Sequence, residues 1–141
     1  MYRLRVDREF PAAHSITIGG EAEEIHGHHF RVGVVVEGSR LDGEELLCDF
    51  HELEARLDRA IEPFRNRTVN GVPPFDHVNP TAEALARHFG EAVAASLPAG
   101  VRLVEASVGE APGCTATYVP AVVSTMVPDT DTDTGIAEAR R

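Results

Sequence analysis

The sequence contains no lysine, so all 13 basic residues among its 141 are arginines. This absence excludes Schiff-base chemistry on a lysine and the lysine-dependent type of phosphate-binding loop. Cysteine is also scarce, because only Cys48 and Cys114 are present and they form no Cys-x-x-Cys pair. The sequence therefore predicts no disulfide framework, and a reducing cytoplasm is the expected location.

Long apolar runs are missing as well, since no stretch approaches the roughly 20 residues that a membrane-spanning helix needs. The first seven residues lack the apolar core of a signal peptide, so we expect no membrane partner. The 23 acidic residues outnumber the 13 basic ones, and the resulting charge of −10 argues against nucleic acid as a partner. A chain of 141 residues has room for one core, which predicts a single domain.

Apolar and charged residues alternate over residues 2–14 and 25–38, with the period of half-buried β-strands. Arg8 interrupts the alternation of the first segment, which predicts a β-bulge near that residue. The core face of the second segment is expected to hold Phe30, Val32, Val34 and Val36.

Two helices are predicted after these strands. Asp49 and Thr81 are the expected N-caps, and Glu52 would complete a capping box with Asp49. Pro63 is expected to end the first helix and Pro98 the second.

Two further strands are predicted over residues 101–110 and 115–122, joined by a Pro-Gly turn. The order strand, strand, helix, helix, strand, strand indicates an α+β domain over residues 1–122. Residues 123–141 contain a repeated Asp-Thr stretch that has nothing to bury, so a disordered tail is expected there.

Three histidines occupy related positions at strand ends. His26 and His28 share one face of the second strand, and His14 ends the first strand on its core face. If these strands pair antiparallel, the three imidazoles converge, and three neutral imidazoles around an open position describe a catalytic zinc site. His29 has the opposite parity and is expected to point away. The alternative, histidines satisfied by hydrogen bonds within the core, remains open at this stage.

Glu110 ends the predicted buried face of its strand, which also carries Val104, Ala106 and Val108. A buried carboxylate is costly unless it meets hydrogen-bond donors. Two adjacent N–H groups on the edge of a planar heterocycle would suit it, and pterins and guanines present such an edge. The alternative is a glutamate at a strand end that reaches solvent.

These motifs together make the chain similar to the family of 6-pyruvoyl-tetrahydropterin and 6-carboxytetrahydropterin synthases. The resemblance covers about residues 1–120. The matching stretches are Phe10-Pro11-Ala12-Ala13-His14, Ile25-His26-Gly27-His28, Cys48-Asp49-Phe50, Asn79-Pro80-Thr81-Ala82-Glu83 and Val108-Gly109-Glu110.

The resemblance implies a tunnelling fold (T-fold), with a four-stranded antiparallel sheet and two helices on one face. In this family the strands of neighbouring subunits join into a barrel, so a homohexamer made of two trimers is implied. Zn²⁺ held by His14, His26 and His28 is implied, together with a pterin substrate anchored by Glu110. The family substrate is 7,8-dihydroneopterin triphosphate, on which zinc and protein acid/base groups move protons.

The chain departs from the family at the usual catalytic cysteine, four residues before the first histidine of His-x-His, where Ala22 stands. The next residue, Glu23, matches a glutamate that replaces the cysteine in one branch. In this respect the chain is similar to synthases that cleave the pterin side chain to give 6-hydroxymethyl-dihydropterin. Glu23 is therefore the acid/base candidate, and the alternative is an acidic residue in a solvated loop.

A second departure concerns the Leu-Asp-His triplet of the family, whose aspartate and histidine assist proton transfer. Phe64-Arg65-Asn66 stands at those positions, and Arg65 is a candidate anion clamp for the triphosphate. Asp76 and His77 form an Asp-His pair elsewhere in the chain. They are either a proton relay from a different backbone position or ordinary loop residues.

The resulting hypothesis is a zinc-dependent lyase or synthase of this family, acting on 7,8-dihydroneopterin triphosphate or a related pterin with an altered product. One alternative is a catalytically degenerate T-fold module that binds a pterin or purine. Another is a small zinc hydrolase in which Glu23 activates water.

Overall fold

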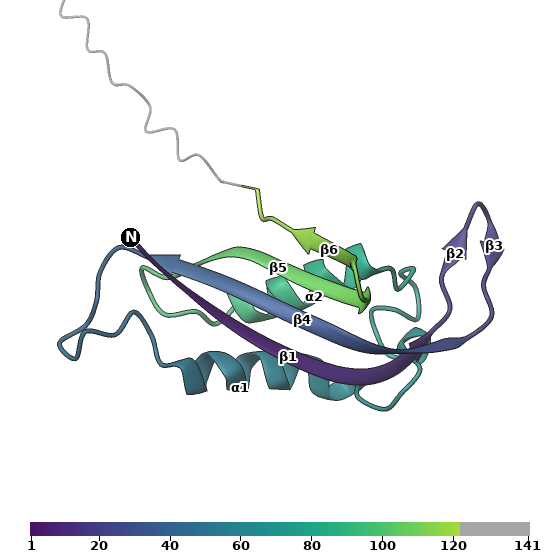
Figure 1. The fold of residues 1–141 in the computed structure, drawn as a ribbon, viewed down its shortest axis with the longest axis horizontal. Coiled ribbons are helices and arrows are strands. Elements are labelled where there is room, and N and C mark those ends of the chain that lie inside the picture. The colour runs from purple at the N-terminus through teal and green to yellow at the C-terminus, as the bar shows by residue number, and fades with distance from the viewer. Residues whose placement is uncertain (122–141) are drawn as a thin grey trace, which may run out of the picture.

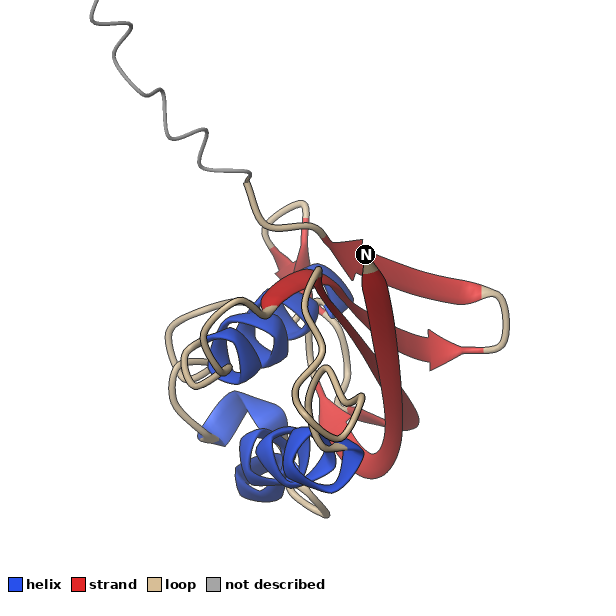
Figure 2. Cartoon of the chain, turned by 90° about the vertical axis from the view of Figure 1, so that its left-hand side faces the viewer, coloured by secondary structure: helices blue, strands red, loops and turns tan. Residues whose placement is uncertain are grey.

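The computed structural model describes residues 1–121, so the predicted tail at 123–141 lies outside the described residues. Four strands form an antiparallel sheet in the order β1-β4-β5-β6, and α1 and α2 cover one of its faces (Figures 1 and 2). The bounds are β1 Tyr2–His14, β4 His26–Gly38, α1 Phe50–Ile61, α2 Ala82–Ala94, β5 Arg102–Ala111 and β6 Cys114–Tyr118. The predicted α+β architecture is confirmed. The last strand ends earlier than predicted, before Pro120, which has no N–H to donate to a sheet.

A small hairpin separates β1 from β4, where the sequence predicted only a loop. It consists of β2 (Thr17–Ile18) and β3 (Glu21–Ala22), and it projects from the end of the sheet (Figure 1). Gly19 and Gly20 form its turn with φ angles of +60° and +83°. A two-residue hairpin turn with both φ angles positive favours glycine, which explains why this Gly-Gly pair closes a hairpin.

The predicted bulge at Arg8 is wrong, because the pairing of β1 with β4 runs without a register shift from Tyr2 to His14. The Arg8 guanidinium instead forms ion pairs with Glu54 and Asp58 of α1. Charged partners on the helix therefore satisfy an arginine on the core side of the strand, and the regular alternation continues past it.

The core lies between the sheet and the two helices. The four residues expected on the core face of β4 are all at most 1% exposed, as are Leu53 and Leu57 of α1 and Leu85 and Phe89 of α2. On β5, Leu103 is buried while Val104 is only partly buried, contrary to the predicted buried face. A register irregularity opposite Val35 and Val36 shifts the alternation at this point.

Both helices begin at their predicted caps. Asp49 accepts a hydrogen bond from the backbone N–H of His51 at 2.8 Å, and Thr81 accepts one from Ala84 at 3.1 Å. Within residues 1–121 no bond from Glu52 back to Asp49 completes the capping box, so that detail is wrong. After α1 the chain forms 3₁₀ turns at Glu62–Phe64 and Val69–Gly71. In this part of the chain, neither helix has the length and apolar character needed to cross a membrane.

On the opposite, helix-free face of the sheet, Glu37 of β4 lies between Arg3 of β1 and Arg102 of β5. It is 3% exposed, accepts a hydrogen bond from Arg3 at 2.8 Å and pairs with Arg102. The hydrogen bond from Arg3, aided by the charge of Arg102, lowers the pKa of Glu37 below its ordinary value.

This lowered pKa predicts a pH-dependent contribution to stability. Because the charged form is favoured in the folded state, the contribution is fully present above the ordinary glutamate pKa of about 4.3. It is lost as the pH falls through the lower pKa of the folded state. We therefore expect the difference in Tm between the wild type and E37Q to stay constant from about pH 7 to about pH 5 and to shrink as the pH falls toward about 3. E44Q, at an exposed glutamate, is the control and should show no such trend; a constant difference for E37Q would contradict the charge-based explanation.

Candidate metal centre

Three imidazoles converge where the pairing of β1 and β4 ends. In this register His14 lies opposite His26, and Ala12 lies opposite His28. One ring nitrogen of each histidine lies within 4.8 Å of the others, and the ring centroids are 4.8 to 5.1 Å apart. The convergence expected from antiparallel pairing is therefore present in the structure.

Backbone carbonyls orient two of these rings. His14 donates from Nδ1 to the carbonyl oxygen of Pro80 at 2.8 Å, and His26 donates from Nδ1 to that of Glu24 at 2.9 Å. A ring that donates from Nδ1 carries its free lone pair on Nε2, and zinc-ligating histidines usually donate their other ring N–H to a carbonyl or carboxylate in this way. The Nε2 atoms of His14 and His28 are buried, and within the described residues neither has a hydrogen-bond partner.

This donor set fits a zinc ion. Zinc is bound well by neutral imidazoles, and three protein ligands leave a fourth position open for substrate. Burial lowers the pKa of His14, which favours the neutral, ligating form. A buried Nε2 without a partner is costly in a protein interior, and a metal bond would satisfy it. We name these three histidines the imidazole triad.

The Asn79-Pro80-Thr81 segment connects the start of α2 to the triad, a role that the sequence did not reveal. The side chain of Asn79 forms two hydrogen bonds with the backbone of Thr17, each of 2.8 Å. Pro80 supplies the carbonyl for His14, and Thr81 caps α2. The motif was visible in the sequence, but its function depends on a contact between segments more than 60 residues apart.

Asn70 forms a second clamp of the same kind. Its side-chain oxygen accepts from the N–H of Ser15 at 2.8 Å, and its amide group donates to the carbonyl of Ser15 at 2.7 Å. Both asparagines thus hold the backbone directly after His14, where β1 leaves the sheet. No local sequence pattern predicts such a clamp, because asparagine in a loop usually forms turns with its own neighbours.

Glu110 of β5 lies beside the triad. Its Oε1 atom is 3.8 Å from Nε2 of His14, and its side chain is 24% exposed. A cavity of about 480 Å³ beside it is lined by residues that include Ile16, Ile18 and Thr81. This carboxylate therefore stands between the free nitrogen of a triad histidine and a partly apolar cavity.

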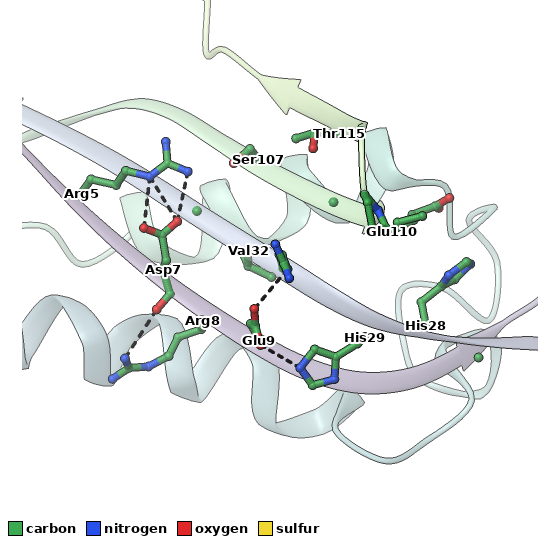
Figure 3. Close-up of a pocket in the computed structure, with 17 residues that line it drawn as sticks. Arg5, Asp7, Arg8, Glu9, His28, His29, Val32, Ser107, Glu110 and Thr115 are labelled. Atoms are coloured by element: carbon green, nitrogen blue, oxygen red, sulfur yellow. Dashed lines mark hydrogen bonds and ion pairs between the residues drawn. The ribbon is translucent and has the colours of Figure 1, made fainter.

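A second cavity, of about 660 Å³, extends along the helix-free face of the sheet and also includes Glu110. Figure 3 shows Glu110 and His28 at the same end of this cavity. His29 is instead hydrogen bonded to Glu9 at 2.8 Å, on the sheet face away from the triad. The parity argument that separated His29 from His28 is confirmed.

Comparison with known proteins agrees with this geometry. The pattern of the family described as 6-pyruvoyl tetrahydropterin synthase matches residues 3–121. The chain belongs to this family. It is also 36% identical over 108 residues to the dihydroneopterin monophosphate aldolase of Pyrococcus furiosus, an alignment that covers 77% of this chain and 89% of that protein.

Solved structures of the 6-pyruvoyl tetrahydropterin synthase family share the fold. The enzyme of Caenorhabditis elegans superposes with a TM-score of 0.75 at 18% identity, covering 85% of this chain and 96% of that one. A Plasmodium vivax synthase, in which alanine replaces a glutamate named as a catalytic residue, gives a TM-score of 0.69 at 17% identity and covers 86% and 98%. The predicted T-fold is therefore confirmed.

Glu23, at the position next to that of the family's cysteine, lies close to the triad. Its Oε2 atom is 3.8 Å from Nδ1 of His26, and its side chain is 39% exposed. The hairpin fixes its backbone, because Glu23 donates to the carbonyl of Ile16 at 2.9 Å and accepts from the Ser15 hydroxyl at 2.5 Å. The carboxylate therefore lies beside Nδ1 of His26, on a different edge of the ring from Nε2.

The other predicted acid/base and anion-binding residues lie on the surface of the chain. Arg65 is 3.5 Å from a carboxylate oxygen of Glu62. His77 is 88% exposed, and within residues 1–121 its polar partner is Asp76, at 3.6 Å. The structure brings neither Arg65 nor the Asp76–His77 pair into contact with the triad of the same subunit.

Proposed function

We propose that this protein is a zinc-dependent lyase that cleaves the side chain of a phosphorylated 7,8-dihydroneopterin. The observation that carries the proposal is the pair of buried, unpartnered Nε2 atoms of His14 and His28, with Glu110 3.8 Å from the first. His14, His26 and His28 would hold the metal. A bound zinc ion supplies a Lewis acid that lowers the pKa of the side-chain hydroxyls.

The cavity beside Glu110 suits the heterocycle of such a substrate. A carboxylate accepts two parallel N–H bonds from a planar donor edge, and such charge-assisted pairs are among the stronger hydrogen bonds. Ile16 and Ile18 give the cavity apolar surface against which a flat ring can pack. This arrangement would place the side chain of the pterin toward the triad, because Glu110 lies next to His14.

The proposed step is a retro-aldol cleavage. The Glu23 carboxylate takes the proton of the hydroxyl on the second side-chain carbon, and that carbon becomes an aldehyde. The bond between the first and second carbons breaks, and its electron pair enters the C=N group of the ring. A proton then adds to the first carbon. The products are 6-hydroxymethyl-7,8-dihydropterin and, from a monophosphate, glycolaldehyde phosphate, so no oxidant or reductant is needed.

Two features favour this cleavage over the standard reaction of the family. The thiol and the Asp-His pair that the family uses to move protons are absent from their usual positions, and the relative from Pyrococcus furiosus is named an aldolase. A retro-aldol cleavage needs one base and one returning proton, which a single carboxylate close to the triad can supply. The altered product expected from the sequence is therefore 6-hydroxymethyl-dihydropterin.

Product analysis tests the proposal. Zinc-loaded protein is incubated with 7,8-dihydroneopterin monophosphate and triphosphate, and products are separated by liquid chromatography with mass detection. We expect 6-hydroxymethyl-7,8-dihydropterin and one equivalent of the phosphorylated aldehyde. Formation of a 6-pyruvoyl or 6-carboxy tetrahydropterin, or no product above the background of zinc alone, would refute it.

Glu23→Gln tests the proposed base. We expect kcat to fall by about 10² to 10⁴-fold, the usual contribution of a positioned acid/base group, while zinc content and pterin affinity stay unchanged. Glu21→Gln, in the same hairpin, is the matched control and should retain activity. If both variants turn over at the wild-type rate, Glu23 is a solvated surface residue and the base lies elsewhere.

A non-catalytic pterin- or purine-binding module is the second candidate. The observation that favours it is the exposure of His77, which leaves the Asp-His pair of this subunit without a contact to the triad. Tight binding of a pterin without turnover, unaffected by Glu23→Gln, would support this candidate.

We also propose the homohexameric assembly that the sequence implied, which light scattering coupled to size-exclusion chromatography measures directly.

A further inference from the structure

The chain after Arg65 is attached to the exposed edge of β1 beside the triad. The N–H of Asn66 donates to the carbonyl of Pro11 at 2.7 Å, and the N–H of Ala13 donates to the carbonyl of Arg67 at 2.9 Å. Thr68 forms a parallel bridge with Ala13. Together with the clamp of Asn70 on Ser15, these bonds fix residues 66–70 alongside the end of β1. We call these residues the edge segment.

The backbone of the edge segment is held in an uncommon conformation. Asn66 has a φ of +57°, in the left-handed region that asparagine tolerates better than most residues. This conformation persists because hydrogen bonds hold the segment on both sides of it. These hydrogen bonds therefore fix the backbone of Arg67 beside Ala13, the residue that precedes His14.

Arg67 and His28 line the same cavity, which has a volume of about 600 Å³. Glu110 does not line this cavity, although His28 and His29 also line the 660 Å³ cavity that includes Glu110. The triad comes from β1 and β4, Glu110 comes from β5, and the edge segment lies along the outer edge of β1. In strand order, the triad therefore lies between Glu110 and the backbone of Arg67.

The charge of Arg67 is available to a ligand. Arg65 is paired with Glu62, whereas no carboxylate of residues 1–121 lies within ion-pair distance of Arg67. In a chain with a net charge of −10, an arginine that has no carboxylate partner and lines the same cavity as a triad histidine is suited to bind an anion. The guanidinium group also matches the geometry of a phosphate, to which it can donate two parallel N–H bonds.

We infer that Arg67, rather than Arg65, recognises the terminal phosphate of the pterin side chain. The inference rests on the proposed function, which places the ring at Glu110 and the side-chain hydroxyls at the triad. The far end of that side chain then extends away from Glu110, into the cavity that Arg67 lines. Arg67 is thus a specificity-determining residue that distinguishes phosphorylated from unphosphorylated dihydroneopterin.

The test compares two ligands, 7,8-dihydroneopterin and its monophosphate, on zinc-loaded protein. Binding is measured by calorimetry in the Glu23→Gln background, so that the ligand is not consumed by the lyase reaction during the titration. We expect Arg67→Ala to weaken binding of the monophosphate by about 10- to 50-fold and to leave the unphosphorylated pterin within about twofold. Arg67→Lys should restore part of the loss, because lysine keeps the charge but not the bidentate geometry.

Arg65→Ala is the matched control, two residues away and already paired with Glu62, and it should leave both affinities unchanged. Equal losses for both ligands in Arg67→Ala, or a loss in Arg65→Ala instead, would overturn the inference. Failure of the proposed function is recognised separately, as the absence of product from the wild-type protein. In that case the ratio of the two affinities still tests whether Arg67 binds the phosphate.

Discussion

Replacing His28 by alanine is expected to abolish stoichiometric zinc binding and, with it, turnover. His28 supplies one of the two buried Nε2 atoms that have no other partner among the described residues. Loss of a group that only orients a zinc ligand already costs about 10- to 100-fold in metal affinity or activity, so loss of a ligand should cost more than about 100-fold. Metal analysis after dialysis, together with steady-state kinetics, measures both quantities.

The neighbouring histidine provides the control for this experiment. His29 is hydrogen bonded to Glu9 on the other face of the sheet, so His29→Ala removes an imidazole of the same strand without touching the triad. It should retain one zinc per chain. Circular dichroism establishes that both variants are folded. Full zinc content in folded His28→Ala would mean that the triad is a hydrogen-bonded core cluster and not a metal centre.

Glu110→Gln is expected to weaken pterin binding by about 10- to 100-fold while zinc content stays at the wild-type level. The substitution keeps the shape of the side chain but removes the charge that strengthens its hydrogen bonds, a loss of about 1.5 to 3 kcal/mol. Calorimetric titration with a pterin measures the dissociation constant, and KM should rise by a similar factor.

Glu105→Gln, on the same strand, is the control and should bind pterin normally. The kinetic constants separate two roles for Glu110. If kcat collapses while the dissociation constant does not change, Glu110 acts as the acid/base group and not as the anchor of the ring. The zinc hydrolase considered from the sequence predicts yet another outcome, in which ester or phosphate hydrolysis continues in Glu110→Ala.

The strands could be predicted from the sequence because burial of one face of a sheet places apolar residues at every second position of a strand. Phe30 and its neighbours on β4 followed that period, and the positions of the triad histidines followed from it. The β-bulge predicted at Arg8 was wrong, because periodicity alone cannot show that Glu54 and Asp58 of α1 pair with this arginine. Leu103 was missed for a related reason, since the register irregularity that buries it arises between two strands.

The site was only partly predictable for the same physical reason. Ligand types and strand parity located the triad, because both are properties of a short stretch of chain. The carbonyl of Pro80 and the amide groups of Asn70 and Asn79 act across the tertiary structure, so no local pattern reveals them. Arg65 was proposed as an anion clamp from the aligned motif alone, and such an alignment cannot show that Glu62 lies 3.5 Å from this arginine.

The edge segment also limits how the sheet can grow. Within the described residues β1 is an outermost strand, and an outermost strand with free hydrogen-bonding groups is a template for another chain. Residues 66–70 already bond to backbone groups of Pro11, Ala13 and Ser15, so these groups are not free to pair with an incoming strand. The end of β1 that carries His14 is therefore closed to strand addition by the chain's own backbone.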